Sequence, residues 1–235
     1  MSGDINTGMG NCLLMSSMVL SYCEAKGIKV RLANNGDDCV LFMEKGDLQA
    51  FAGLDKWMLD FGFTLTREEP VDVLEQVSFC QAHPVLTSSG WRMCRDPRVS
   101  MSKDMVALHG WGSEVEVKYW LHSIGTCGLA LTTGVPLLSV WYRRLTELGV
   151  KPSQAWVDNI GASGLVYMAR GVVAEDKIGD ETRVSFYRAF GITPEQQLAC
   201  EDVYRTLDTE FTPRPVMLSN ITATDFALNP LSIVS

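Results

Sequence analysis

The sequence predicts an α+β protein whose second half is mostly helical, and three observations support this fold class. With 235 residues, of which 46% are hydrophobic and 20% charged, the chain can bury the core of one large or two small globular units. Residues 1 to about 90 alternate helical patterns with short strand-like runs, whereas helical spacing predominates after Arg98. We therefore expect helices on one face of an antiparallel sheet, followed by a helical unit.

The first predicted elements are a helix and a β-hairpin. Apolar side chains recur at helical spacing over residues 7–25, and Gly27 follows as a natural stop. Residues 29–33 and 39–43 are apolar or β-branched runs on either side of the turn-forming residues 34–38. This pattern indicates a hairpin with acidic residues at its tip.

The remaining elements follow from the same periodicities. A second helix is expected over residues 47–60, with Asp47 as its N-cap. Further strands are predicted at residues 63–66, 77–80 and 85–86. Helices of the second part are predicted at residues 113–131, 136–148, 154–161 and 194–207. Residues 209–235 contain three prolines and no clear period, which indicates a surface strap or a loose tail.

Composition excludes several classes of protein. The longest apolar stretches are shorter than the roughly 20 residues of a membrane span, and the N-terminus lacks the features of a secretory signal, so we expect a soluble chain without a transmembrane segment. The seven cysteines never form a C-x-x-C spacing, which favours free buried thiols over a zinc site. A net charge of −8 disfavours binding of nucleic acid by bulk electrostatics.

The hairpin tip is the first candidate for chemistry. Gly36, Asp37 and Asp38 put two carboxylates side by side, and Mg²⁺ prefers such oxygen ligands while it keeps several waters and shares substrate phosphates. In two-metal sites, a pair of ions stabilises the attacking and the leaving oxygen of a phosphoryl transfer. An ordinary polar turn is the alternative, and the tripeptide alone does not exclude it.

A second segment lies upstream, at the start of the first helix. Ser2 and Gly3 precede Thr7 and Asn11, which are one turn apart and share a helical face. The donors and acceptor of an amide suit a ribose 2′-OH, the group that distinguishes RNA from DNA. Alternatively, Ser2 is an N-terminal cap and Asn11 an ordinary surface residue.

In this order and at this separation, the two segments resemble motifs B and C of the RNA-dependent RNA polymerases of positive-strand RNA viruses. The strings SGDINTGMGNC, NNGDDCVLF and FCQ are most similar to the tombusvirus-like group. Residues 61–70 resemble the motif D region, and residues 77–81 resemble the primer-grip hairpin called motif E. The resemblance covers residues 2 to about 105; beyond them it rests on chain position, where such enzymes have a helical thumb.

The resemblance implies a domain organisation and a reaction. Residues 1–95 would be the C-terminal half of a polymerase palm, residues 96–208 a helical thumb, and residues 209–235 a strap or tail. The implied activity is template-directed nucleotidyl transfer from ribonucleoside triphosphates by a two-metal mechanism, with Mg²⁺ or Mn²⁺ as cofactor. The implied partners are the RNA template, the nascent strand and other replicase proteins. The implied location is the host cytoplasm, at viral replication complexes held on membranes by other parts of the polymerase.

Residue roles carry over by position. Asp37 would ligate the catalytic metal ions, with Asp38 beside it in a supporting role, so both are candidate catalytic and metal-binding residues. The implied pocket for the incoming nucleotide and template is lined by Ser2, Gly3, Thr7 and Asn11. In the motif D region, Arg67 is a poor proton donor because the pKa of arginine is above about 12, so the role of proton donor stays unassigned.

A basic cluster lies next to an aromatic residue, Trp91, and suits contact with the RNA backbone combined with base stacking. Its members are Arg92, Arg95, Arg98 and Lys103. A solvated charged face is the alternative. Other tryptophans are expected in the core of the helical part, namely Trp111, Trp120, Trp141 and Trp156.

One carboxylate that the family requires has no counterpart here. Its D-x-x-x-x-D strand precedes motif B, and Met1 directly abuts the motif B segment. We therefore expect a C-terminal portion of a polymerase that is inactive in isolation, since phosphoryl transfer depends on positioning and charge. One alternative is a non-catalytic RNA-binding or replicase-assembly subunit that works with a separate chain. Another is an unrelated α+β protein with an acidic hairpin.

Overall fold

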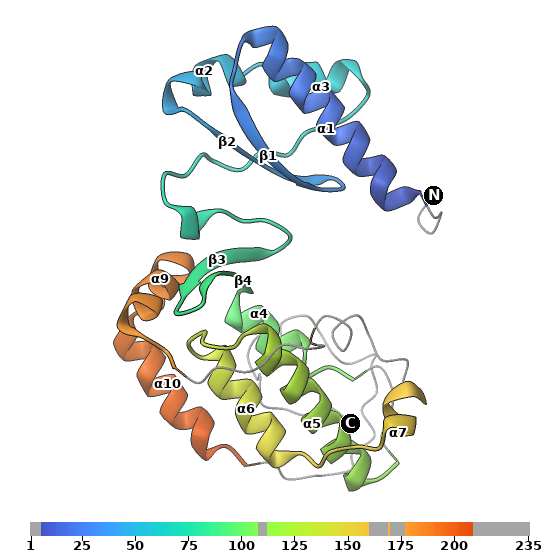
Figure 1. Ribbon diagram of the computed structural model, residues 1–235, viewed down its shortest axis with the longest axis vertical. Coiled ribbons are helices and arrows are strands. Elements are labelled where there is room, and N and C mark those ends of the chain that lie inside the picture. Colours follow the sequence, from blue (N-terminus) through green and yellow to red (C-terminus); the bar gives the residue numbers. More distant parts are fainter. Residues whose placement is uncertain (1–5, 108–111, 160–168, 170–176, 209–235) are drawn as a thin grey trace, which may run out of the picture. The chain divides into compact units, whose positions relative to one another are not determined.

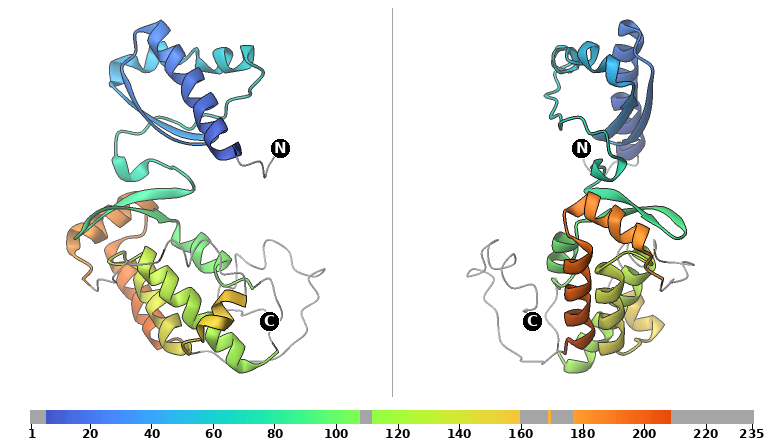
Figure 2. Two further views of the ribbon diagram at one scale, coloured as in Figure 1. Left: turned by 45° about the vertical axis from the view of Figure 1, so that its right-hand side comes forward. Right: turned by 90° about the vertical axis from the view of Figure 1, so that its left-hand side faces the viewer.

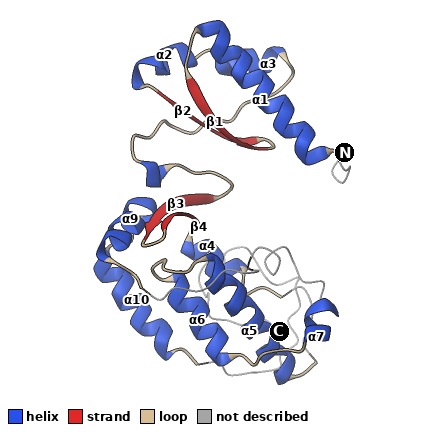
Figure 3. Ribbon diagram, in the orientation of Figure 1, coloured by secondary structure: helices blue, strands red, loops and turns tan. Residues whose placement is uncertain are grey.

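The computed structural model describes residues 6–107, 112–159, 169 and 177–208. These residues form helices and two small antiparallel sheets, consistent with the predicted α+β class (Figure 3). The chain divides into two compact units, Met1–Ala82 and His83–Ser235. The predicted tail, residues 209–235, lies outside the described residues.

The first unit begins with the predicted helix and hairpin. Helix α1 (Thr7–Lys26) ends where Gly27 takes up a left-handed conformation, with φ of 67°. Strands β1 (Val30–Asn35) and β2 (Asp38–Met43) pair antiparallel over their whole length. The predicted helix over residues 7–25 and the predicted hairpin are both confirmed.

One face of the hairpin packs against helices. Directly opposite residues of an antiparallel pair point to the same face, and faces alternate along each strand. The pair Val30 and Met43 and the neighbouring Leu41 pack against the buried cluster, so this face is the inner one. Figure 1 shows α1 lying across the hairpin. The buried members of the cluster are Val19, Tyr22, Cys23, Ile28, Phe51, Leu54 and Met58.

The single helix predicted for residues 47–60 is wrong. The chain instead forms a short 3₁₀ turn, followed by α2 (Leu48–Phe51) and α3 (Leu54–Asp60). The hydroxyl of Tyr22 donates a hydrogen bond of 2.7 Å to the Ala50 carbonyl, a group that a continuous helix would use internally. Asp47 makes no side-chain capping hydrogen bond. A contact from α1 therefore breaks the helix.

The predicted strands after α3 are also corrected. Residues 63–66 form no strand, and residues 77–80 contribute only an isolated bridge from Phe79 to Ala82. Residues 85–86 do lie in a strand, but it pairs within a separate hairpin of the second unit. Among the described residues, no further strand borders β1 or β2. Residues 63–66 therefore have no neighbouring strand with which to form a sheet.

The second unit contains one hairpin and a group of helices. Its elements are β3 (Ala82–Thr87), β4 (Gly90–Arg95), α4 (Pro97–Lys103), α5 (Glu114–Leu131), α6 (Leu138–Leu148), α7 (Gln154–Asn159), α9 (Asp180–Phe190) and α10 (Pro194–Thr206). The four predicted helices of this part are confirmed within one or two residues at their described ends, and the last two residues of the helix predicted at 154–161 lie outside the described residues. Strand β4 and helices α4 and α9 were not predicted. Figure 2 shows α10 running beside α6, in agreement with their contacts.

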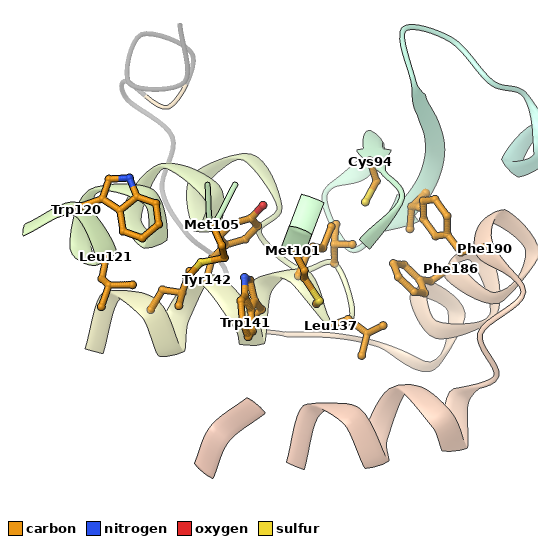
Figure 4. Packing of buried hydrophobic residues seen from close by; sticks show 14 of the residues in the cluster. Cys94, Met101, Met105, Trp120, Leu121, Leu137, Trp141, Tyr142, Phe186 and Phe190 are labelled. Atoms are coloured by element: carbon orange, nitrogen blue, oxygen red, sulfur yellow. The ribbon is translucent and has the colours of Figure 1, made fainter. Parts of the chain in front are cut away.

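The core of this unit forms where α5 and α6 meet. The Tyr142 ring lies directly on Gly128, and a side-chain carbon at Gly128 would overlap that ring. The glycine therefore sets how closely the two helices approach. Trp120 and Trp141 are buried in this core, as predicted, and Figure 4 shows the surrounding apolar side chains. Trp156 packs at the edge of the core, and Trp111 lies outside the described residues.

A buried ion pair joins α9 and α10. Both carboxylate oxygens of Glu201 accept hydrogen bonds from the Arg183 guanidinium, at 3.0 and 2.9 Å, and the Glu201 side chain is fully buried. The same carboxylate accepts a bond of 3.1 Å from the backbone N–H of Leu137, a residue with φ of 62°. Glu201 thus holds the strained residue at the start of α6 and links three helices.

Helix α1 exposes apolar side chains on the surface away from its core. Met9, Leu13 and Leu20 are 65%, 60% and 43% exposed and recur at helical spacing along one side, with Leu14 next to them. A helix that is apolar all round is normally buried. In the described part of the chain, no helix is both long enough and apolar enough to cross a bilayer.

Replacing Glu201 by alanine is expected to lower the free energy of unfolding of the second unit by about 3 kcal/mol, because the mostly buried Arg183 would lose its carboxylate partner and, among the described residues, keep only the Gln197 amide oxygen as an acceptor. Urea unfolding followed by tryptophan fluorescence measures this loss, since five of the six tryptophans belong to this unit. Asp202→Ala is the matched control: it removes an exposed carboxylate from the same helix and should change stability little. Equal losses of unfolding free energy in the two variants would contradict the role of Glu201 as the buried partner of Arg183.

The 235-residue chain in isolation is expected to self-associate through the exposed apolar side of α1. Sedimentation velocity should show large species that diminish when Leu13 and Leu20 are both replaced by lysine. The control places lysines at Leu198 and Val203, which are exposed apolar residues of α10, and should leave association unchanged. A monomeric unsubstituted chain would contradict this expectation.

Candidate functional site

The tip of the β1–β2 hairpin is a tight two-residue turn. Asn35 and Asp38 form the last pair of the ladder, and Gly36 and Asp37 connect them. Gly36 has φ of 76°, the positive value that the first central residue of a type II′ turn needs. The Asn34 side-chain amide donates to the carbonyls of Gly36 and Asp38, at 3.0 and 3.3 Å. The conformation of the turn is therefore fixed by local chemistry.

On one face, the tip lies against the first turns of α1. The backbone N–H of Gly36 donates to the Cys12 thiol at 3.0 Å, and the Cβ of Asn11 lies 4.0 Å from the position that a Cβ of Gly36 would occupy. The fold thus brings the turn together with Asn11, and Thr7 lies one turn earlier on the same helix. Ser2 and Gly3 lie outside the described residues.

On the other face, the tip binds a second turn. Residues 79–82 fold back on themselves, because the backbones of Phe79 and Ala82 exchange hydrogen bonds of 2.9 and 3.0 Å. The backbone N–H of Cys80 donates to Asp38 Oδ2 at 2.6 Å, and Asn35 Nδ2 donates to the Cys80 thiol at 3.1 Å. The segments predicted to correspond to motifs C and E therefore lie in direct contact.

The two carboxylates of the tip differ in their surroundings. Asp38 is half-buried and engaged by Cys80, whereas Asp37 is exposed at the outer position of the turn. Within the described part of the chain, no hydrogen bond or ion pair engages the Asp37 carboxylate, and no group of three His, Cys, Asp or Glu side chains could hold a metal ion. Asp37 therefore offers a free carboxylate of the kind that Mg²⁺ prefers, but the described residues do not supply all the ligands of a metal site.

The cysteines are free thiols, as predicted, and all seven lie in the described residues. Cys23, Cys94 and Cys127 are buried, and burial raises the pKa of Cys94 to about 12. Cys12, Cys39 and Cys200 are partly buried and Cys80 is exposed, so the expectation of buried thiols holds for three of the seven. The position of Cys80 at the centre of the tight 79–82 turn explains the exposure of its side chain.

In the motif D region, Arg67 is held by the neighbouring helices. Its guanidinium donates to the Phe51 carbonyl at 3.4 Å and lies 3.5 Å from the Asp55 carboxylate. These contacts give Arg67 a packing role. The proton-donor role remains unassigned.

The basic cluster of the second unit is divided between β4 and α4: Arg92 and Arg95 lie on opposite faces of the strand, and Arg98 and Lys103 lie in the helix. Arg92 points inward, donating to the Leu131 carbonyl at 3.3 Å, while Trp91 on the opposite face is 52% exposed. The other three side chains are exposed to a larger degree: Arg95 and Arg98 lie near acidic partners, and Lys103 ends α4. Contact of these residues with RNA stays a prediction.

The hairpin tip is thus in contact with α1 on one face and with the 79–82 turn on the other, the segments whose sequences resemble motifs B and E. The chain belongs to the viral RNA-dependent RNA polymerase family, whose sequence model matches residues 1–212. This membership excludes the alternative of an unrelated α+β protein.

Individual relatives agree with the family. The chain is 42% identical over 212 residues to the RNA-directed RNA polymerase of Turnip crinkle virus, and 42% identical over 210 residues to that of Carnation mottle virus. It is 39% identical over 209 residues to the enzyme of Tobacco necrosis virus (strain A). The predicted tombusvirus-like resemblance is confirmed. Each match covers 88% of this chain but only 27% to 29% of the relative, so the chain spans less than a third of their length.

Replacing Gly36 by alanine should loosen the tip, since a left-handed backbone costs a non-glycine residue roughly 1–2 kcal/mol. Amide hydrogens of β1 and β2 near the turn should exchange about 5–30 times faster, measured by hydrogen exchange with mass spectrometry. Gly46→Ala is the control, because Gly46 has no positive φ and an added Cβ would meet nothing within 4 Å. Unchanged exchange in the Gly36 variant would show that the turn is not constrained as described.

Proposed function

We propose that this chain is the part of a viral RNA-directed RNA polymerase that carries its Gly-Asp-Asp turn. The reaction is template-directed nucleotidyl transfer from ribonucleoside triphosphates by a two-metal mechanism. The observation that carries the proposal is the fixed turn at residues 36–37, which rests on the first turns of α1 and leaves the Asp37 carboxylate open. Family membership and the names of the relatives support the same reaction.

The residue roles follow from this arrangement. Asp37 would bind the catalytic ions, Mg²⁺ or Mn²⁺, which stabilise charge on the attacking and leaving oxygens of phosphoryl transfer. Asn11 lies beside the turn and Thr7 one helical turn earlier, and their amide and hydroxyl would orient the ribose of the incoming nucleotide. By resemblance, Ser2 and Gly3 line the same pocket.

We assign residues 1–95 to the polymerase palm and residues 96–208 to its helical thumb. In this assignment, Trp91 provides a stacking surface for RNA, and the exposed basic residues of the second unit contact the backbone of template and nascent strand. Arg92 supports β4 from its inner side and contributes less to RNA contact than Arg95, Arg98 and Lys103. We further propose that the polymerase acts in the host cytoplasm, at membrane-held replication complexes that contain other replicase proteins.

The metal site requires at least one more carboxylate than the described residues supply. We propose that this group comes from a part of the polymerase outside the 235 residues. The relatives are more than three times as long as their matched regions, which is consistent with such a part. The exposed apolar side of α1 would then be covered in the longer protein.

A longer polymerase that contains this chain should incorporate labelled ribonucleotides on an RNA template in the presence of Mg²⁺, whereas the 235-residue chain alone should not. Asp37→Asn in the longer protein should reduce incorporation by at least about a hundredfold, because an amide is a poor metal ligand. Asp60→Asn, at the exposed end of α3, is the matched control and should keep full activity. Retention of activity by the Asp37 variant would refute the proposed role.

A further inference from the structure

The 79–82 turn contains an unusual backbone. Cys80 and Gln81 both have positive φ, 53° and 59°, although neither is glycine. Two positive φ values at the centre of a two-residue turn are typical of type I′ turns, which normally contain Asn, Asp or Gly. Non-glycine residues keep such conformations only where surrounding contacts stabilise them.

The hairpin tip supplies these contacts. The pair Asn35 and Asp38 points to the face of the hairpin opposite to the helix-packed face, because Asn34 and Cys39 form the neighbouring pair. Asp38 accepts from the Cys80 N–H at 2.6 Å, and Asn35 donates to its thiol at 3.1 Å. The two bonds attach the 79–82 turn to the tip from the side that α1 leaves open.

These contacts separate the roles of the two acidic residues. The short bond from an N–H to a carboxylate is of the charge-assisted kind, roughly twice as strong as a neutral hydrogen bond. It uses one oxygen of Asp38, while the Asp37 carboxylate next to it stays exposed. The tip is therefore held from both faces, by Cys12 and by Cys80, with Asp37 between them.

We propose that Asp38 is a positioning residue. Its carboxylate accepts a hydrogen bond from the backbone N–H of Cys80 and thereby fixes the turn that presents Asp37. Asn35 assists from the opposite strand through the Cys80 thiol. This inference rests on the proposed function, since it explains how the metal-binding turn is held. It goes beyond the supporting role that the resemblance implies for Asp38, because it names the backbone N–H of Cys80 as the group that Asp38 holds.

Two substitutions separate positioning from metal binding. Asp38→Asn and Asp38→Ala both remove the negative charge, but only asparagine keeps an oxygen that can accept from Cys80. In the longer polymerase, the alanine variant should lose about 10- to 100-fold in kcat, the range of a hydrogen bond to a charged group, and the asparagine variant should restore most of this loss. Equal, near-complete inactivation of both variants would show that Asp38 acts as a metal ligand and would overturn the proposal, as would full activity of both.

A second measurement does not depend on catalysis. In the 235-residue chain that also carries Leu13→Lys and Leu20→Lys to limit self-association, exchange of the Cys80 amide hydrogen, followed by NMR, should be about tenfold faster in Asp38→Ala than in Asp38→Asn. Unchanged exchange of the β1 and β2 amides shows that both variants keep the hairpin. Equal Cys80 exchange in the two variants would overturn the proposed hydrogen bond between Asp38 and Cys80, even if Asp37→Asn abolishes polymerisation. Faster exchange in Asp38→Ala supports this hydrogen bond, even if the longer polymerase proves inactive.

Discussion

The attachment of the β1–β2 tip on both of its faces is the constraint on which the proposed chemistry depends. Local contacts set the conformation of the turn, but a two-stranded hairpin is barely stable by itself, so the position of a carboxylate at its end depends on what holds the hairpin tip. The Cys12 thiol holds Gly36 from the helix side, and Asp38 binds the Cys80 backbone on the other side. Segments far apart in sequence thus define the position of a single side chain, Asp37. Catalysis by positioning and charge stabilisation requires this kind of rigidity.

The two compact units differ in how completely they bury their apolar surface. The second unit encloses its own core, and a buried carboxylate, Glu201, links three of its helices. The first unit instead consists of a small hairpin and helices whose longest member, α1, is apolar on both its inner and its outer side. A two-stranded sheet is barely stable by itself. This contrast fits a unit that forms one part of a larger catalytic domain.

The sequence predicted the local features of the site and missed those that depend on distant contacts. The hairpin and α1 were predictable because Gly36 and Gly27 mark their turn and their end. The interruption between α2 and α3 was not predictable, because it is caused by the Tyr22 hydroxyl, which binds the Ala50 carbonyl from 28 residues away in the sequence. Helix α9 was missed because its buried side includes polar residues, which hide its periodicity. The bond from Cys80 to Asp38 was unpredictable because a backbone N–H leaves no signature in the sequence.

The most direct test of this account is to locate Mn²⁺ by its anomalous scattering in crystals of a longer polymerase that contains this chain, with template and nucleotide bound. If Asp37 binds the metal and Asp38 holds the turn, a metal peak lies at the carboxylate of Asp37, with Asp38 still accepting from the Cys80 N–H. A peak coordinated by Asp38, with the Cys80 contact broken, would contradict the division of roles. Metal bound without any contact to Asp37 would contradict the proposed site as a whole.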